Sequence, residues 1–201
     1  MIFTIIKVLL IGVVIGLTLL IIKKRKKKTK AGLIALIVAM VIVCTAVGYI
    51  RLEKLVTFPS AETGFKMCFT GRTADRVDGE NSCLFVSDKG MDGELFRKTE
   101  RGWRCAGRID KLRGELKTVE GGMLYLYKDE VSGDTYAFWT MDSTDLDGAA
   151  PVFTDTCGND LSIYPVIATD DIFVYNMVGY VAGDPNEYRL IVDGEIVPFK
   201  D

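Results

Sequence analysis

Histidine is absent from all 201 residues of this chain. Its absence excludes Ser–His–Asp and Cys–His catalytic systems and metal sites with imidazole ligands. The chain also lacks a C-x-x-C pair, a Walker A loop, a G-x-G-x-x-G dinucleotide motif and a G-x-S-x-G nucleophile motif. We therefore expect a protein that is not an enzyme and that binds no cofactor. The remaining enzymatic alternative is a hydrolase that uses two carboxylates, as glycosidases do.

Acidic residues are absent from the first quarter of the chain. Residues 1–50 contain no Asp or Glu and carry 8 of the 25 Lys and Arg residues. Residues 51–201 therefore combine 17 basic with 27 acidic residues, a formal charge of −10. Such a charge disfavours nucleic acid as a partner, because its phosphate backbone attracts cations. The chain is predicted to join a basic segment to an acidic domain.

Two long apolar runs occupy residues 2–22 and 31–50. At 1.5 Å per residue, each helix would span roughly 30 Å, the thickness of a bilayer's hydrocarbon core. Lys7 interrupts the first run, but the 16 Ile, Leu, Val and Phe residues there favour insertion by about 5 to 9 kcal/mol, against about 3 for one lysine. A cleaved signal peptide fits less well, because no small-residue cleavage site follows the run. We predict a transmembrane helical hairpin over residues 1–50.

The loop between the two runs is strongly basic. Its cations are Lys23, Lys24, Arg25, Lys26, Lys27, Lys28 and Lys30. Short loops of this kind stay in the cytoplasm, which would place both the amino terminus and the acidic domain outside it. The same cations would also suit anionic lipid headgroups. The chain has no N-x-[ST] sequon, which favours a bacterial cell membrane over a eukaryotic one.

Small residues recur at four-residue spacing in both runs. They are Gly12 and Gly16 in the first run and Ala31, Ala35 and Ala39 in the second. Such spacing lets helix backbones approach closely, either within the hairpin or between copies of the chain in a homo-oligomer. Chance is the alternative, because Gly and Ala are common in membrane helices.

From residue 51 the pattern changes to short apolar stretches separated by turn residues. We expect a linker over residues 51–63 and an all-β domain over residues 64–201, as an antiparallel meander or sandwich. The candidate strands are 65–70, 83–87, 94–99, 102–107, 123–128, 135–141, 151–154, 161–167, 171–177, 187–192 and 195–199. The pairs Asp193–Gly194, Ser132–Gly133 and Arg101–Gly102 are typical of hairpin turns.

Three strand pairs form a weak internal repeat, beginning near Cys83, Met123 and Asp171. Intervals of 40 and 48 residues between hairpins resemble the spacing of β-propeller blades. Three units are too few to close an ordinary propeller, which needs about four blades. The expectation is therefore an all-β domain with propeller-like hairpin repeats.

Four cysteines follow the apolar runs, at Cys68, Cys83, Cys105 and Cys157. An even number in an extracytoplasmic domain permits two disulfides, in any of three connectivities. The alternative is that the thiols pack as small apolar groups. Cys44 lies within the second run and is expected to be inert.

Two further features suggest binding sites. The acidic stretch at residues 142–148 contains Asp142, Asp145 and Asp147, whose oxygens would suit Ca²⁺ if the stretch is more than a solvated turn. The second feature is a group of aromatic residues, Tyr125, Tyr127, Tyr136, Phe138 and Trp139. Core packing is their default interpretation, and an exposed recognition patch for sugar or peptide is the alternative.

These observations favour a membrane-anchored protein that presents a non-enzymatic β domain outside the cytoplasm for binding or assembly. Its expected partners are the lipid bilayer and a protein or envelope component. One alternative is an immunity-type protein that protects the cell from a toxin, with the acidic domain steering a basic partner. The other alternative is the carboxylate-based extracytoplasmic hydrolase.

Overall fold

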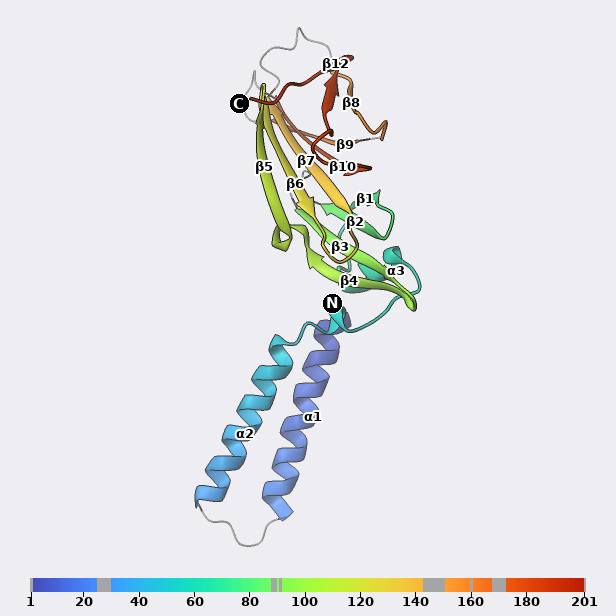
Figure 1. Cartoon of the computed structure of the whole chain (residues 1–201). Coiled ribbons are helices and arrows are strands. Elements are labelled where there is room, and N and C mark those ends of the chain that lie inside the picture. The colour runs from blue at the N-terminus through green and yellow to red at the C-terminus, as the bar shows by residue number, and fades with distance from the viewer. Residues whose placement is uncertain are drawn as a thin grey trace.

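Two helices and a β domain make up an elongated molecule, shown by a computed structural model (Figure 1). The structure describes residues 2–24, 30–87, 90, 92–142, 151–159, 161–167 and 173–200. Helices α1 (Ile2–Lys24) and α2 (Lys30–Tyr49) lie side by side at one end. The β domain occupies the other end, and its strands lead away from the hairpin.

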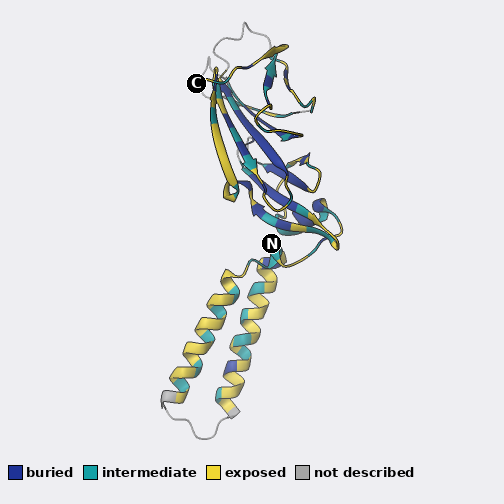
Figure 2. Cartoon of the chain, viewed as in Figure 1, coloured by how far each residue is buried: buried dark blue, intermediate teal, exposed yellow. Residues whose placement is uncertain are grey.

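The two helices of the hairpin have the composition of membrane spans. Their most apolar windows have mean hydropathies of 3.0 and 2.5, and only 6% and 0% of those windows are buried. A core helix of a soluble protein would be buried, whereas these helices expose apolar side chains over most of their surface (Figure 2). Both helices are therefore long and apolar enough to cross a membrane.

Larger side chains, rather than the small ones, line the contact between the two helices. Leu33, Leu36 and Met40 are partly covered in α2, whereas Ala35 and Ala39 are exposed. In α1, a Cβ atom added at Gly12 or Gly16 would meet nothing within 4 Å. The side chain of Ala31 lies outside the described residues. The small residues thus leave room for a second copy, and such an association stays a prediction.

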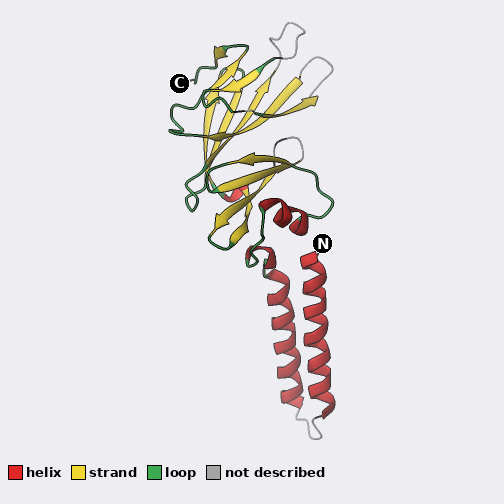
Figure 3. Ribbon diagram, turned by 90° about the vertical axis from the view of Figure 1, so that its right-hand side faces the viewer, coloured by secondary structure: helices red, strands yellow, loops and turns green. Residues whose placement is uncertain are grey.

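The β domain consists of three antiparallel sheets. The first sheet has the order β1-β2-β3-β4, the second β5-β6-β7-β10-β9 and the third β12-β11-β8. Their strands are β1 (Asp75–Asp78), β2 (Ser82–Ser87), β3 (Asp92–Thr99), β4 (Gly102–Arg108), β5 (Arg113–Val119), β6 (Gly122–Lys128), β7 (Thr135–Asp142), β8 (Phe153–Asp155), β9 (Ser162–Ile167), β10 (Phe173–Val181), β11 (Leu190–Val192) and β12 (Glu195–Ile196). The first sheet lies nearest the hairpin (Figure 3). The all-β prediction for the soluble part is confirmed.

The apolar residues of this domain gather in three clusters. One lies between the second and third sheets around Trp139, Leu124 and Leu190. A second lies between the first and second sheets, around Leu84, Leu95 and Tyr136. The third lies beside the hairpin, around Phe58, Phe85 and Phe96. Strand β2 shows the period of two in a strand, because Cys83 and Phe85 belong to the third cluster and Leu84 and Val86 to the second.

The propeller-like repeat is not present as blades among the described strands. The repeat unit near Cys83 lies in the first sheet and the unit near Met123 in the second. The third unit, expected to begin near Asp171, is divided, because β10 belongs to the second sheet and β11 to the third. Successive blades would each form a sheet of their own. Only the first two units are hairpins, since β2 pairs with β3 and β6 with β7, whereas β10 pairs with β7 and β9 and β11 pairs with β12 and β8.

A short helix replaces the strand expected at residues 65–70. Helix α3 (Ala61–Cys68) begins at Ser60, whose Oγ accepts a hydrogen bond from the backbone N–H of Thr63 at 3.1 Å. This is the geometry of an N-cap, and it stabilises the first turn. The helix buries Ala61, Gly64 and Phe65 against the first sheet. Strands β1 and β5 also lie where no strand was expected.

Asp193–Gly194 forms the hairpin turn that its sequence predicts. Both residues have positive φ, at 51° and 89°, and Ile191 pairs with Ile196 across the turn. Aspartate tolerates this left-handed region better than most residues, and glycine enters it at little cost. Gly133 (φ 83°) follows Ser132, and Gly102 (φ 123°) follows Arg101, in the two other turns that the sequence indicated.

The hairpin is joined to the β domain by packing as well as by the chain. Phe3 at the start of α1 is only 9% exposed, and its ring meets that of Phe58 edge-on at 6.3 Å. Phe58 in turn pairs with Trp103 through two backbone hydrogen bonds of 2.7 and 2.8 Å. Lys7 donates a hydrogen bond to the carbonyl of Gly48 at 3.2 Å, near the end of α2. The lysine thus lies close to the end of the hairpin rather than at its centre.

Candidate functional site

A pocket of about 440 Å³ opens at the end of the β domain farthest from the hairpin. We call it the distal pocket. Its floor is apolar, because Met141, Phe153 and Val197 line it and are 7–8% exposed. Ile196 also lines it but is 60% exposed. The other residues along its wall are Gly121, Val192 and Pro198.

Four carboxylates surround this apolar floor. They belong to Glu120, Asp142, Asp193 and Glu195, which are all exposed. Lys and Arg are missing from the eleven described residues that line the pocket. Ligand sites are typically apolar with a few placed polar groups, and this pocket follows that pattern with a negative rim.

Backbone hydrogen bonds from three parts of the chain hold the distal pocket in shape. Asp193 Oδ1 accepts from the N–H of Val152, and the N–H of Asp193 donates to the carbonyl of Val152, both at 2.9 Å. The N–H of Glu120 donates to the carbonyl of Pro198 at 3.2 Å. The turn after β5, the start of β8 and the β11–β12 hairpin therefore meet at this pocket.

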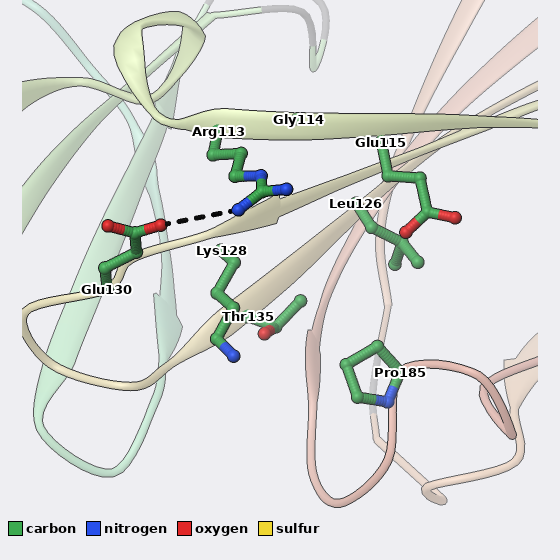
Figure 4. Close-up of a pocket in the computed structure, with 8 residues that line it drawn as sticks. All are labelled: Arg113, Gly114, Glu115, Leu126, Lys128, Glu130, Thr135 and Pro185. Carbon is green, nitrogen blue, oxygen red and sulfur yellow. Dashed lines mark ion pairs between the residues drawn. The ribbon is translucent and has the colours of Figure 1, made fainter.

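A second pocket, also of about 440 Å³, lies over β5 and β6 (Figure 4). We call it the sheet groove. Arg113 faces Lys128 and Glu115 faces Leu126 across the two strands. Arg113 also lies 3.9 Å from Glu130, but both side chains are mostly exposed, so this ion pair contributes little. The groove is also lined by Gly114, Thr135 and Pro185.

The sheet groove continues into a smaller polar pocket of about 280 Å³, since Lys128, Thr135 and Pro185 line both. The smaller pocket adds Tyr180, Glu80 and other polar or small residues. Together the two pockets present charges of both signs beside few apolar side chains, namely Leu126, Val181 and Pro185. The distal pocket is more apolar and is therefore the better candidate for a ligand site.

A buried ion pair fixes the turn between β6 and β7. Arg97 donates from Nε and an Nη atom to the two carboxylate oxygens of Asp129, each at 2.6 Å. Ser132 Oγ donates to the same carboxylate at 2.7 Å. The Asp129 side chain is 1% exposed and that of Arg97 28%. This pair ties β3 of the first sheet to the second sheet.

A second polar group lies beside this pair. The Asp134 carboxylate accepts hydrogen bonds from Ser82 Oγ and from the N–H of Asn81, the latter at 3.0 Å. Ser82 Oγ also lies 2.8 Å from the hydroxyl of Tyr136. Burial and the nearby Asp134 raise the pKa of Tyr136 despite its hydrogen bond to Ser82. Ser82 and Tyr136 are both fully buried, so this group holds the sheets together rather than meeting a substrate.

Glu94 carries the most deeply buried carboxyl near the hairpin. The residue is 6% exposed, and burial raises its pKa although Arg51 opposes the shift. One carboxylate oxygen, Oε2, has no hydrogen-bond partner among the described residues. A raised pKa would suit a general acid, but Glu94 lines none of the pockets described above.

The cysteines are free thiols. Cys83 pairs with Phe96, and Phe96 pairs with Cys105 on its other side. Two strand spacings of about 4.8 Å therefore separate Cys83 from Cys105, which is too far for a disulfide. Burial raises the pKa of Cys83 to about 12. Cys68 packs against the same cluster as Cys105. Cys157 donates instead to the carbonyl of Ala182.

The remaining sequence-predicted residues lie in different settings. Asp142 ends β7 on the rim of the distal pocket, whereas Asp145 and Asp147 lie outside the described residues. Within the described residues, no three acidic or cysteine side chains are grouped as metal ligands. Lys23 ends the most apolar stretch of α1. The positions or side chains of the other loop cations, Lys24, Arg25, Lys26, Lys27, Lys28 and Lys30, lie outside the described residues.

The aromatic residues serve mainly as core. Tyr136, Phe138 and Trp139 are buried, which confirms the packing interpretation for these three. Tyr125 and Tyr127 are half-buried and stack with ring centroids 6.3 Å apart. The distal pocket was missed in the sequence, because its rim combines Glu120, Asp142 and Glu195 from three hairpins. The local signals were the Asp193–Gly194 turn and Asp142, which the sequence offered only as a calcium ligand.

Comparison with known proteins gives no match to a family model, a curated protein or a solved structure.

Proposed function

We propose that this chain is a membrane-anchored, non-enzymatic binding protein whose β domain is presented outside the cytoplasm. The distal pocket is its binding site, and its ligand is a segment of a partner protein that carries Lys or Arg beside an apolar side chain. The observation that carries the proposal is the apolar floor surrounded by four carboxylates without a cation.

The position of the pocket supports this role. It opens at the end of the molecule opposite the hairpin, where a membrane would hold it away from the lipid surface. The basic loop supports an outward orientation, because dense cations in a short loop favour the cytoplasmic side. A partner in the surrounding envelope would then reach the pocket without crossing the bilayer.

Charge supports a cationic ligand. Residues 73–201 contain 13 Lys and Arg against 25 Asp and Glu, a formal charge of −12. A field of this sign attracts a basic partner at long range, and the apolar floor then holds an apolar side chain at short range. A basic toxin is one such partner, in which case the chain would be an immunity-type protein. The same steering would serve a basic envelope protein.

Photo-cross-linking from within the pocket tests the proposal. A benzoylphenylalanine at Ile196, which is 60% exposed in the pocket, is expected to form adducts in the membrane of the producing cell. The same group at Val131, 74% exposed in the β6–β7 turn, is the matched control. Sequencing of the cross-linked peptides should show Lys or Arg next to an apolar residue.

Two results would overturn this assignment. One is the same set of adducts from positions 196 and 131, which would show contact without a specific site. The other is the lack of any adduct specific to position 196, or adducts there only with acidic segments. An adduct with a basic toxin would identify the immunity-type function, and one with another envelope protein would identify assembly.

A further inference from the structure

The face of the β domain next to the hairpin has exposed apolar side chains directly after the second span. Ile50 is 43% exposed, Leu55 67% and Val56 38%. These residues follow the end of α2 at Tyr49 within seven positions, with the short 3-10 helix η1 (Leu52–Lys54) between them. Chain connectivity therefore keeps them at the boundary of the bilayer, wherever the rest of the domain lies.

Helix α3 lies at the same level. A small cavity of about 160 Å³ is lined by Phe3, Thr4 and Lys7 of α1 together with Cys68 and Phe69 at the end of α3. The end of α3 is thus beside the first two turns of the first span, which is where lipid headgroups surround a transmembrane helix. Figure 3 shows α3 directly above the amino-terminal end of the hairpin.

The charge of this region is opposite to that of the rest of the domain. Residues 51–72 carry four basic residues against Glu53 and Glu62, a formal charge of +2, whereas residues 73–201 stand at −12. Lys66 and Arg72 are exposed, and the Arg72 guanidinium lies 5.8 Å from the centre of the Phe69 ring. Lys54 is partly exposed beside the exposed Leu55. Cations next to apolar side chains are the pattern of a surface that lies in the membrane interface.

We propose that this face is a lipid-binding surface for anionic phospholipid. Lys66 and Arg72 contact the phosphates, and Leu55 and Val56 enter the headgroup region. The acidic remainder of the domain is repelled by the same lipids, so the domain stands upright with its distal pocket away from the membrane. Because both leaflets contain headgroups, this inference does not depend on the orientation of the hairpin.

Quenching by headgroup-labelled lipid tests the surface in the full chain. A coumarin amino acid is placed at Leu55 or, as a matched control of similar exposure, at Ile196 in the distal pocket. Each protein is reconstituted into nanodiscs of phosphatidylcholine, or of equimolar phosphatidylcholine and phosphatidylglycerol, with a trace of lipid that carries a nitroxide on its headgroup. We expect several-fold stronger quenching at position 55 than at position 196, and a further rise with phosphatidylglycerol.

The variant Lys66→Glu with Arg72→Glu separates the charge from the insertion. It is expected to lose the rise with phosphatidylglycerol while the combined emission of Trp103 and Trp139 shows that the domain remains folded. Equal quenching at positions 55 and 196 would overturn the proposal. The proposal would also be overturned if phosphatidylglycerol did not raise the quenching at position 55 in the parent chain. The same holds if that rise persisted unchanged in the folded double variant.

Discussion

Replacement of Asp129 by alanine is expected to lower the free energy of unfolding of the β domain by about 3 kcal/mol. Asp129 is 1% exposed and receives two hydrogen bonds of 2.6 Å from Arg97. Loss of one member of a buried ion pair leaves the other without compensation, which typically costs about 3–5 kcal/mol. The lower end applies because the Arg97 side chain remains 28% exposed and water can solvate it. Urea unfolding of the full chain in detergent, followed through the combined emission of Trp103 and Trp139, measures the effect.

The effect of Asp129→Ala should depend on pH. Burial alone would raise the pKa of Asp129, but the hydrogen bonds from Arg97 and Ser132 outweigh it and hold the pKa below the ordinary value of 3.8. A carboxylate with a lowered pKa in the folded state contributes its full stability above the pKa of the unfolded state. The contribution is lost as the pH falls through the folded-state value. Parent and variant should therefore converge in stability below about pH 4.

Asp110→Ala is the matched control for Asp129. Asp110 pairs with Arg108 at 3.3 Å, but its side chain is 50% exposed. Exposed pairs contribute about 0–1 kcal/mol, so this variant should remain close to the parent chain. Equal losses in the two variants would contradict the role that we assign to the buried pair.

Reversal of two charges on the rim of the distal pocket is expected to lower the affinity for a basic, apolar peptide strongly. The double variant Glu120→Lys with Glu195→Lys should bind a short peptide of alternating lysine and leucine roughly 100-fold more weakly at low salt, about tenfold for each reversed charge. Both residues are exposed, so the fold should be unaffected. Titration by isothermal calorimetry against the full chain in detergent measures the affinity.

The control is a double variant at a second pair of exposed glutamates, which has the same net charge as the double variant in the distal pocket. Glu100 and Glu130 lie in hairpin turns outside the distal pocket, and their replacement by lysine should weaken binding only through the long-range field. High salt should remove most of the difference between the two double variants, because ions screen exposed charges. Equal weakening at low salt would place the peptide elsewhere on the domain.

The two apolar helices of the hairpin follow from local composition alone. Two runs of about 20 apolar residues require helices in lipid, and no distant part of the chain alters that requirement. The Asp193–Gly194 turn is local in the same sense, because positive φ at two successive positions restricts the residues that fit. Such features could be predicted because their cause lies within a few residues of their effect.

Helix α3 shows where local pattern misleads. Phe65, Met67 and Phe69 alternate with Lys66, Cys68 and Thr70, which is the period of a half-buried strand. The sequence signal for the helix was Ser60, a residue type that often caps a helix and here accepts a hydrogen bond from the N–H of Thr63. A helix of eight residues has few turns, so its 3.6-residue period is hard to detect in the sequence. Contact of Phe65 with Phe85, at 4.5 Å between stacked rings, stabilises the helix through tertiary packing.

The candidate site depended on long-range pairing and could not be predicted. The pocket is assembled because Val119 pairs with Phe199 and β8 pairs with β11, contacts that join positions far apart in the sequence. The cysteines illustrate the same point. Their even number permitted disulfides, but Phe96 lies between Cys83 and Cys105 in the first sheet. Sheet order, rather than residue type, assembles the pocket and separates these two thiols.

Labelling of a surface cysteine in intact cells tests most directly whether the β domain lies outside the cytoplasm. Val131 is 74% exposed. In intact cells, the variant Val131→Cys should be labelled by a membrane-impermeant maleimide more strongly than the parent chain is. Lys26→Cys in the basic loop should react only after the cells are opened. The reverse pattern, with position 26 labelled in intact cells and position 131 protected until lysis, would contradict the account.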